Sequence, residues 1–223
     1  MRGAAAVAIC ALVLGGCTVE VRGQPTAPPG LSAFTPSANN QDPSRRIPGV
    51  EVQTYQGAYH VAPDQAVAYT HSPPFGGAHD SYWAACNGVV FADPVRSENL
   101  VHSLEHGAVW ITYDPDRATP AALATLRSKV EAKPYMVMSP YPGLSRPISL
   151  QSWGHQLMVT DADDVRIDQF ITALRLNPYT YPELSASCNA LGPGLFDQDD
   201  PPPFAPVPPV SAIDGSRTFA EEG

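Results

Sequence analysis

The sequence has few basic residues and no long apolar run. It contains 13 Lys and Arg against 22 Asp and Glu, which gives a formal net charge of -9. Nucleic-acid binding needs an excess of cations to neutralise phosphates, so this balance predicts that nucleic acid is not a partner. The same balance disfavours electrostatic docking on an anionic membrane surface. No window approaches the roughly 20 apolar residues that a membrane-spanning helix needs.

Several motifs of common enzyme classes are also missing. The sequence contains no Walker loop, no glycine-rich dinucleotide fingerprint and no Gly-x-Ser-x-Gly elbow. These motifs carry phosphate binding, dinucleotide binding and nucleophilic hydrolysis, respectively. Their absence leaves other kinds of site to be sought among the remaining polar residues.

The first residues are typical of an export signal. Arg2 supplies a positive charge, and an apolar run from Ala4 to Gly16 follows it. The run ends in Leu-Gly-Gly-Cys17, which looks like the lipobox of bacterial lipoproteins. This likeness implies that residues 1–16 are removed and that lipid is attached to Cys17, so we expect a protein anchored in the cell membrane on its extracytoplasmic face. The alternative is an ordinary signal peptide that is cleaved nearby.

Only two cysteines remain in the expected mature domain. The chain has four, of which Cys10 leaves with the signal and Cys17 carries the lipid. Cys86 and Cys188 then lie in an oxidising compartment, where pairing is the expected outcome. The bridge would close a loop of about 100 residues and stabilise the fold by on the order of 4–5 kcal/mol in the chain-entropy treatment. A redox or metal-binding role for either thiol is the alternative.

Proline divides the chain into three further segments. The sequence holds 25 prolines, more than one packed domain of this size normally accommodates. Residues 17–48 are rich in Pro, Ser, Gly and Asn, so we expect a flexible linker. Residues 192–223 are acidic and proline-rich, which predicts a disordered tail. A globular domain is expected over residues 49–191.

Within that domain the hydrophobic period alternates between two and 3.6 residues. The pattern predicts short strands at 50–54, 66–69, 89–91, 108–113, 135–138, 148–153 and 157–159. Helices are predicted over 119–132 and 164–176, and a short one is expected within 97–107. Helices interleaved with hairpin-like strands favour a compact α+β domain with a largely antiparallel sheet and two or three helices.

The short helix carries the most informative polar residues. His102, Glu105 and His106 stand at positions i, i+3 and i+4, so their side chains project from one face. Gly107 suits the left-handed residue that ends such a helix. Two imidazoles one turn apart can chelate one ion of Zn, Cu, Ni or Fe. A further ligand would have to come from elsewhere, and the loop over residues 71–79 is the obvious source.

The same string, His-x-x-Glu-His, is also the inverted zinc-protease signature. In that interpretation Glu105 is the general base, which makes it the one candidate catalytic residue. The signature needs a long helix, however, whereas Gly107 ends this one and a strand follows at once. A third interpretation is structural: His and Glu side chains joined in a buried hydrogen-bond network.

A larger set of motifs resembles a known family. The motifs are Pro-Pro-x-Gly-Gly-x-His79, Cys86-x-Gly, Glu-Asn-x-Val-His-Ser-Leu-Glu-His106-Gly, Ser-Pro-Tyr-Pro-Gly-Leu144 and Ser-Trp-Gly154. Over about residues 55–190 the chain is similar to the bacterial domain of unknown function numbered 3105, which is common among exported actinobacterial proteins. The resemblance implies a single fold and an exported location but no activity.

The resemblance also ranks the histidines and supports the cysteine pair. It implies His at positions 60, 79, 102 and 106, whereas His71 and His155 are not part of the pattern. Cysteines at 86 and 188 are common in the family, which fits a disulfide.

The leading hypothesis is therefore a lipid-anchored extracytoplasmic domain that binds a transition metal. The predicted ligands are His60, His79, His102 and His106, with Glu105 as a further candidate. Nitrogen ligands in that number favour Cu(II) or Zn(II). One alternative is a metal-free scaffold or adaptor that recognises another cell-envelope protein through its sheet or its acidic tail. The other is a metallohydrolase that uses Glu105 as its base.

Overall fold

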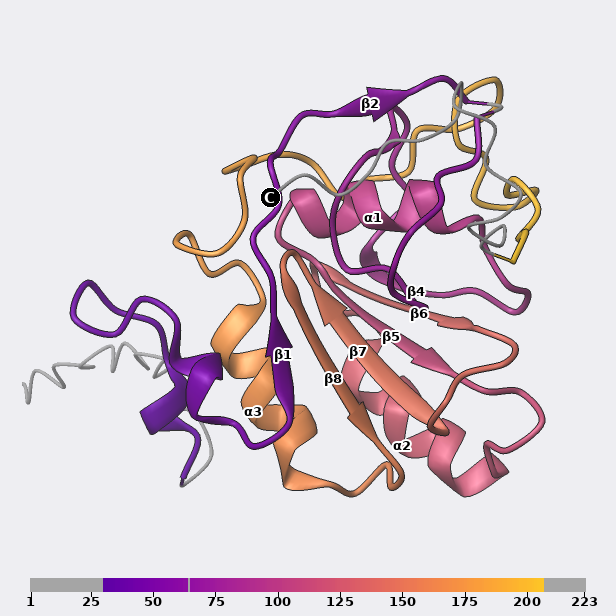
Figure 1. Ribbon diagram of the computed structural model, residues 1–223. Coiled ribbons are helices and arrows are strands. Elements are labelled where there is room, and N and C mark those ends of the chain that lie inside the picture. Colours follow the sequence, from indigo (N-terminus) through magenta and orange to yellow (C-terminus); the bar gives the residue numbers. More distant parts are fainter. Residues whose placement is uncertain (1–29, 64, 207–223) are drawn as a thin grey trace, which may run out of the picture.

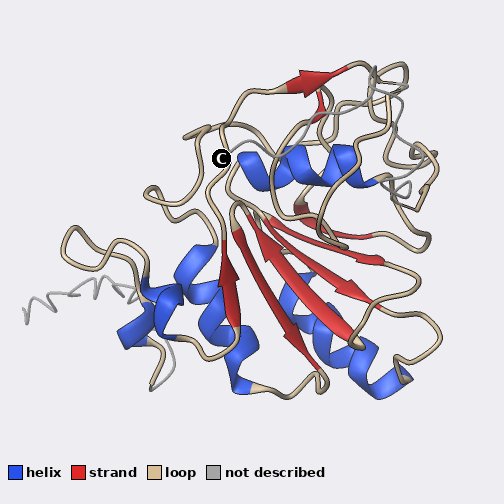
Figure 2. Ribbon diagram, in the orientation of Figure 1, coloured by secondary structure: helices blue, strands red, loops and turns tan. Residues whose placement is uncertain are grey.

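A six-stranded mixed sheet forms the centre of the fold (Figures 1 and 2). The computed structural model describes residues 30–63 and 65–206. In order across the sheet, the strands are β1 (Val50–Val52), β8 (His155–Val159), β7 (Ile148–Ser152), β5 (Val109–Tyr113), β6 (Met136–Pro140) and β4 (Asn87–Val90). Among the first four, each strand runs antiparallel to its neighbour, whereas β6 runs parallel to both β5 and β4. The sheet is thus largely antiparallel, as predicted.

Three α-helices pack on the two faces of this sheet. They are α1 (Ser97–Glu105), α2 (Pro120–Val130) and α3 (Val165–Leu174). Because side chains alternate along a strand, Val109 and Ile111 of β5 join the core with α2 and α3, whereas Trp110 joins the core with α1. In Figure 1, α2 and α3 lie behind the sheet and α1 crosses above it. The predicted compact α+β class is confirmed.

One predicted strand is wrong. Residues 66–69 form no strand, although Val67 and Tyr69 are buried. The backbone N–H of Val67 donates instead to a carboxylate oxygen of Glu98 at 2.8 Å. A buried N–H needs a partner, and here a side chain replaces the neighbouring strand that the alternation would otherwise require.

Helix α1 is buried along its whole length, although much of its sequence is polar. Its apolar residues Leu100, Val101 and Leu104 pack into one core. Gly107 follows the helix with a φ of +91°, and an added Cβ there would lie 2.7 Å from the ring of Tyr181. The helix therefore ends at a position that only glycine fits, and its polar face is covered by other parts of the chain rather than by water.

Two very short strands cover that polar face. They are β2 (His60–Val61) and β3 (His79–Asp80), which pair in parallel with His60 opposite His79. Figure 1 shows β2 above α1, on the side away from the six-stranded sheet. This pairing brings two histidines from distant parts of the sequence to adjacent positions over the helix.

The predicted disulfide between Cys86 and Cys188 is present. Both residues are buried, and the N–H of Cys86 donates to the carbonyl of Cys188 at 3.0 Å. The bridge fixes the segment that follows α3 beside the strand β4 and helix α1.

Parts of both flanks, before residue 49 and after residue 191, pack on the domain. Two 3-10 helices, η1 (Ser32–Phe34) and η2 (Pro43–Arg46), contact α3, and Ile47 is buried. On the other flank Phe196 is fully buried and the ring of Phe204 lies 5.0 Å from that of Tyr141. Isolated large apolar residues within proline-rich sequence are enough to hold these segments.

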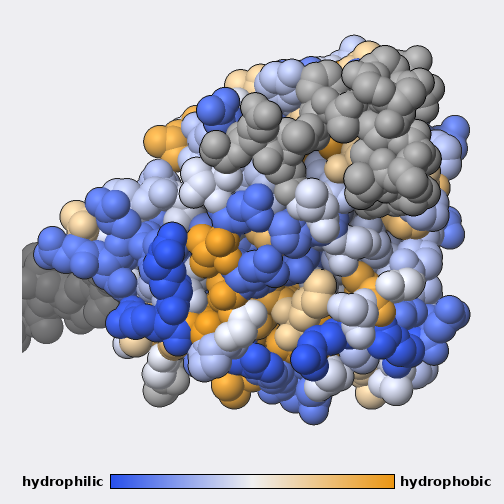
Figure 3. Space-filling view, viewed as in Figure 1, coloured by the Kyte–Doolittle hydropathy of each residue, from blue (hydrophilic) through white to orange (hydrophobic). Residues whose placement is uncertain are grey.

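The surface of the domain is mainly polar on the face that Figure 3 shows, with hydrophobic residues in small patches between polar ones. Within the described residues, no helix has the length and apolar character needed to cross a membrane. The expected signal peptide over 1–16 and the expected lipid site Cys17 lie outside the described residues.

Candidate metal centre

Four side chains converge between β2, β3 and α1. They are His60, His79, His102 and Glu105, and one ligand atom from each lies within 4.8 Å of all the others. The three imidazole rings have centroids 4.8–5.0 Å apart. His79 and Glu105 are fully buried, whereas the side chain of His60 is 37% exposed. The cluster is therefore enclosed by protein except on the His60 side.

A close approach of the chain covers Glu105. At Gly57 an added Cβ would lie 2.8 Å from an oxygen of Glu105 and 2.7 Å from Pro182. The next residue, Ala58, donates its backbone N–H to the same carboxylate oxygen, Oε1. The segment before β2 thus passes directly over Glu105 and fixes the direction of its carboxylate.

His79 and His102 both turn Nε2 toward the cluster, because Nδ1 of each ring is bonded to the backbone. Nδ1 of His79 lies 2.9 Å from the carbonyl of Gly77, and Nδ1 of His102 lies 2.6 Å from the carbonyl of Asp80. A carbonyl can only accept, so Nδ1 carries the proton in both rings. A neutral ring then has a lone pair on Nε2. A hydrogen bond from Nδ1 to a backbone carbonyl is what orients many histidines that bind metals through Nε2.

Two buried polar atoms of the cluster, one of His79 and one of Glu105, lack a hydrogen bond. Nε2 of His79 lies 2.7 Å from Oε2 of Glu105, yet neither atom has a hydrogen-bond partner of acceptable geometry among the described residues. By contrast, His155 and Asp42 at 3.2 Å do form a hydrogen bond. Two buried lone-pair atoms that face each other without a proton between them are costly, and a cation removes that cost.

The spacing of the cluster suits such an ion. Bonds of about 2.0–2.1 Å from a tetrahedral centre place neighbouring ligand atoms about 3.3 Å apart. The separations of Oε2 of Glu105 from Nε2 of His79 and of His60, 2.7 and 3.9 Å, lie on either side of that value. The kinds of ligand present and these two separations are compatible with a four-coordinate ion.

The charge states favour metal binding as well. Burial raises the pKa of Glu105, but the contact with His79 and the N–H of Ala58 outweigh it and hold the pKa below its usual value. Burial, together with the neighbouring His79 and His106, lowers the pKa of His102 to about 3. The cluster thus combines an ionised carboxylate with a neutral imidazole, which are the protonation states that ligands require.

His106 lies outside this four-residue cluster, in a second group with His102 and Glu183. Its Nε2 is 3.1 Å from Oε2 of Glu183, and its Nδ1 is 2.7 Å from the carbonyl of Ser187. The sequence pattern places His106 with the other three histidines, whereas the structure places Glu105 there. The pKa of His106 is lowered, mainly because the residue is buried. The sequence gives no sign of Glu183, because this residue lies in an irregular segment with no motif of its own.

The zinc-protease interpretation would put His102 and His106 on one ion with Glu105 free to act as base. Instead, Glu105 has one oxygen on Ala58 and the other facing His79. Its position is that of a ligand or of a structural carboxylate.

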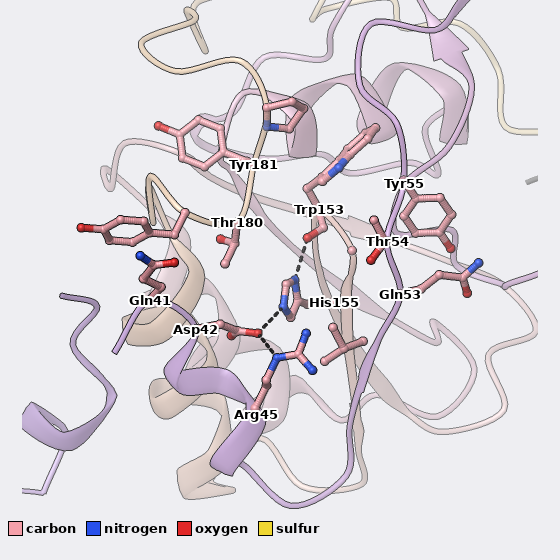
Figure 4. Close-up of a pocket in the computed structure, with 14 residues that line it drawn as sticks. Gln41, Asp42, Arg45, Gln53, Thr54, Tyr55, Trp153, His155, Thr180 and Tyr181 are labelled. Atoms are coloured by element: carbon pink, nitrogen blue, oxygen red, sulfur yellow. Dashed lines mark hydrogen bonds and ion pairs between the residues drawn. The ribbon is translucent and has the colours of Figure 1, made fainter. Parts of the chain in front are cut away.

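The remaining two histidines lie elsewhere. His71 is 3.1 Å from Glu51, and His155 is 3.2 Å from Asp42 and 2.6 Å from the carbonyl of Trp153. His155 lines a pocket of about 370 Å³ together with Asp42, Arg45 and several aromatic residues (Figure 4). Neither His71 nor His155 belongs to either His/Glu group.

The comparison with protein families decides what this chain is related to. A family model described as Protein of unknown function (DUF3105) matches residues 60–190. The chain belongs to this family. No curated protein and no solved structure matches the chain. The DUF3105 match begins at His60 and covers every residue of both His/Glu groups as well as both cysteines of the disulfide.

Proposed function

We propose that this DUF3105 protein binds one transition-metal ion, Cu(II) or Zn(II), through His60, His79, His102 and Glu105. The observation that carries the proposal is the buried contact between His79 Nε2 and Glu105 Oε2, which has no hydrogen-bond geometry. A bound cation accepts both lone pairs and removes the repulsion between them.

The donor set supports the choice of ion. Three imidazole nitrogens and one carboxylate oxygen suit Zn(II), and nitrogen-rich sites bind Cu(II) more tightly than the other first-row divalent ions. Hard cations such as Mg²⁺ prefer a shell of oxygen ligands, so this cluster disfavours them.

The same proposal places the ion outside the cytoplasm. The lipobox-like sequence that ends at Cys17 supports export and lipid attachment. The disulfide within the domain suits an oxidising compartment. We propose a protein held on the extracytoplasmic face of the membrane by its lipid, where it handles metal ions of the cell envelope.

Metal content tests the proposal directly. The full chain is purified through its own export route, without a polyhistidine tag, and its Cu and Zn are measured by plasma mass spectrometry. We expect about one ion per chain, bound more weakly in His79→Ala and in Glu105→Gln and lost in His102→Ala. His71→Ala is the matched control, because His71 lies outside both groups and its variant keeps the ion.

The opposite result has a clear meaning. A folded wild-type chain that contains no Cu or Zn, and takes up neither when it is added, makes the cluster a structural network. The metal-free scaffold that recognises another envelope protein then becomes the better account.

A further inference from the structure

The second group of side chains shares a residue with the proposed metal centre. His102 belongs to both groups, with His60, His79 and Glu105 on one side and with His106 and Glu183 on the other. The rings of His102 and His106 have centroids 4.6 Å apart. Outside the proposed centre, this is the only other cluster of metal-ligating side chains that the described part of the chain contains.

His106 is held in the same manner as His79. Its Nδ1 points at a backbone carbonyl, that of Ser187, at 2.7 Å, and its Nε2 is 3.1 Å from the carboxylate of Glu183. A neutral imidazole has one proton for these two acceptors, so a cation at Nε2 satisfies the second. This second group therefore repeats the chemistry of the first with a different carboxylate.

We propose that His102, His106 and Glu183 form a second, exchange position for the same ion, which rests on the proposed function. The centre with Glu105 is named the inner position, and the one with Glu183 is named the outer position. The ion enters or leaves through the outer position, and His102 stays bound while the other ligands change.

The two positions cannot be filled together through His102. Its Nδ1 is 2.6 Å from the carbonyl of Asp80 and donates to it, so only Nε2 can bind a metal. One nitrogen lone pair ligates one ion. The sharing therefore predicts one ion per chain at saturation, distributed between two positions, rather than a pair of ions.

The donor counts give the two positions different roles. The inner position offers four ligands, two of them fully buried, and can close the shell of a tetrahedral ion. The outer position offers only three ligands. Glu183 and His60 are exposed to a similar degree, so the number of ligands, and not exposure, distinguishes the two positions. A three-ligand site keeps one coordination position open, which an incoming chelator or a donor side chain of a metal carrier can occupy. Storage is thus expected at the inner position and exchange at the outer one.

Release kinetics separate the two positions. The full chain is loaded with one Cu(II), and its removal by excess EDTA is followed by stopped-flow absorbance. We expect Glu183→Gln to retain the ion at equilibrium but to release it at least about tenfold more slowly, on the scale of the losses that follow removal of one metal-site partner. Glu131→Gln is the matched control and releases the ion at the wild-type rate, because Glu131 is exposed, directly follows α2 and belongs to neither group, while α2 packs on the other face of the sheet from α1.

Equilibrium binding of Cu(II) provides the second arm. Glu105→Gln and His79→Ala each remove one ligand of the inner position, and we expect each still to bind one ion with affinity about 10- to 100-fold lower. If the outer position supplies this remaining binding, adding Glu183→Gln to either variant abolishes it. His102→Ala removes a ligand from both positions, so binding is lost. Far-UV circular dichroism checks that each variant is folded, and the Glu183→Gln kinetics test the proposal even where an inner-position variant does not fold.

The possible results distinguish this inference from the proposed function. Release from Glu183→Gln at the wild-type rate, or two ions per wild-type chain, overturns the exchange position and leaves the metal centre intact. Complete loss of binding in folded Glu105→Gln does the same. A wild-type chain that binds no Cu(II) or Zn(II) overturns both proposals together.

Discussion

At the scale of single residues, the position of one proton decides how the His79–Glu105 contact is interpreted. With Nδ1 of His79 donating to Gly77, the Nε2 that faces Glu105 has either a lone pair or a second proton. A second proton would make the contact a buried ion pair, whose cost of desolvation must be recovered by good hydrogen-bond geometry. That geometry is missing here, so a cation accounts for the contact better than a proton.

The substitution Glu105→Gln distinguishes the two accounts through stability. The amide keeps an oxygen for Ala58 and gains an N–H that can donate to His79. In EDTA we expect the variant to be as stable as the wild type or more stable, by up to about 1 kcal/mol, because the facing lone pairs are removed. Added Zn(II) then raises the melting temperature of the wild type more than that of the variant. A large loss of stability in EDTA would instead identify the contact as a structural ion pair.

At the scale of elements, the way α1 ends determines where its polar face points. Gly107 adopts a left-handed conformation between α1 and β5, and the ring of Tyr181 occupies the place of a side chain. For Gly107→Ala we expect a loss of about 1–3 kcal/mol, the range for a strained backbone, with the contact against Tyr181 added to it. Gly143→Ala is the control, because its φ is +81° but its added Cβ meets nothing within 4 Å. Chemical denaturation of both variants isolates the steric part, and equal losses would show that Tyr181 simply moves aside.

Asp42, directly before the 3-10 helix η2, is hydrogen-bonded to His155 of strand β8. Burial raises the pKa of Asp42, but hydrogen bonds from His155 and Ser44 outweigh it and bring the pKa to about 2, below its ordinary 3.8. A lowered pKa means that Asp42 stabilises the fold above pH 3.8 and that this contribution is lost as the pH falls toward 2. We therefore expect Asp42→Asn to melt below the wild type at about pH 5–7 and the difference to vanish near pH 2. If the difference in melting temperature does not change with pH, the charge of Asp42 does not stabilise the fold.

The local sequence predicts the helices and strands better than it predicts which of their residues come into contact. The spacing of His102, Glu105 and His106 places these side chains on one helix face, since that depends on helical period alone. The pairing of His60 with His79 lies in two-residue strands, which are too short to show a period. Glu183 reaches His106 from an irregular segment after α3, so only the tertiary structure reveals it. The alternation of apolar and polar residues around Val67 predicts a strand. The local sequence does not show that the carboxylate of Glu98, and not a neighbouring strand, accepts the N–H of Val67.

At the scale of the whole molecule, the disulfide both stabilises the fold and holds the segment that contacts the candidate site. Cys188 follows Ser187, whose carbonyl accepts from His106, and Glu183 lies in the same segment and donates its N–H to the carbonyl of Glu105. The bridge spans a sequence separation of 102 residues, so its removal frees a long loop of the unfolded chain. It therefore contributes both to the free energy of unfolding and to the placement of the outer ligands.

The double variant Cys86→Ser/Cys188→Ser separates these two contributions. Loop entropy predicts a loss of on the order of 4–5 kcal/mol in the free energy of unfolding, measured by urea denaturation. The inner ligands come from β2, β3 and α1, none of which contains a bridged cysteine, so the folded variant should still bind one ion. The outer ligands depend on the segment that the bridge holds, so we expect the variant to release Cu(II) to EDTA as slowly as Glu183→Gln does. Wild-type release kinetics in a folded, unbridged chain would show that the contacts of Glu183 and Ser187 with α1 hold the outer position without the disulfide.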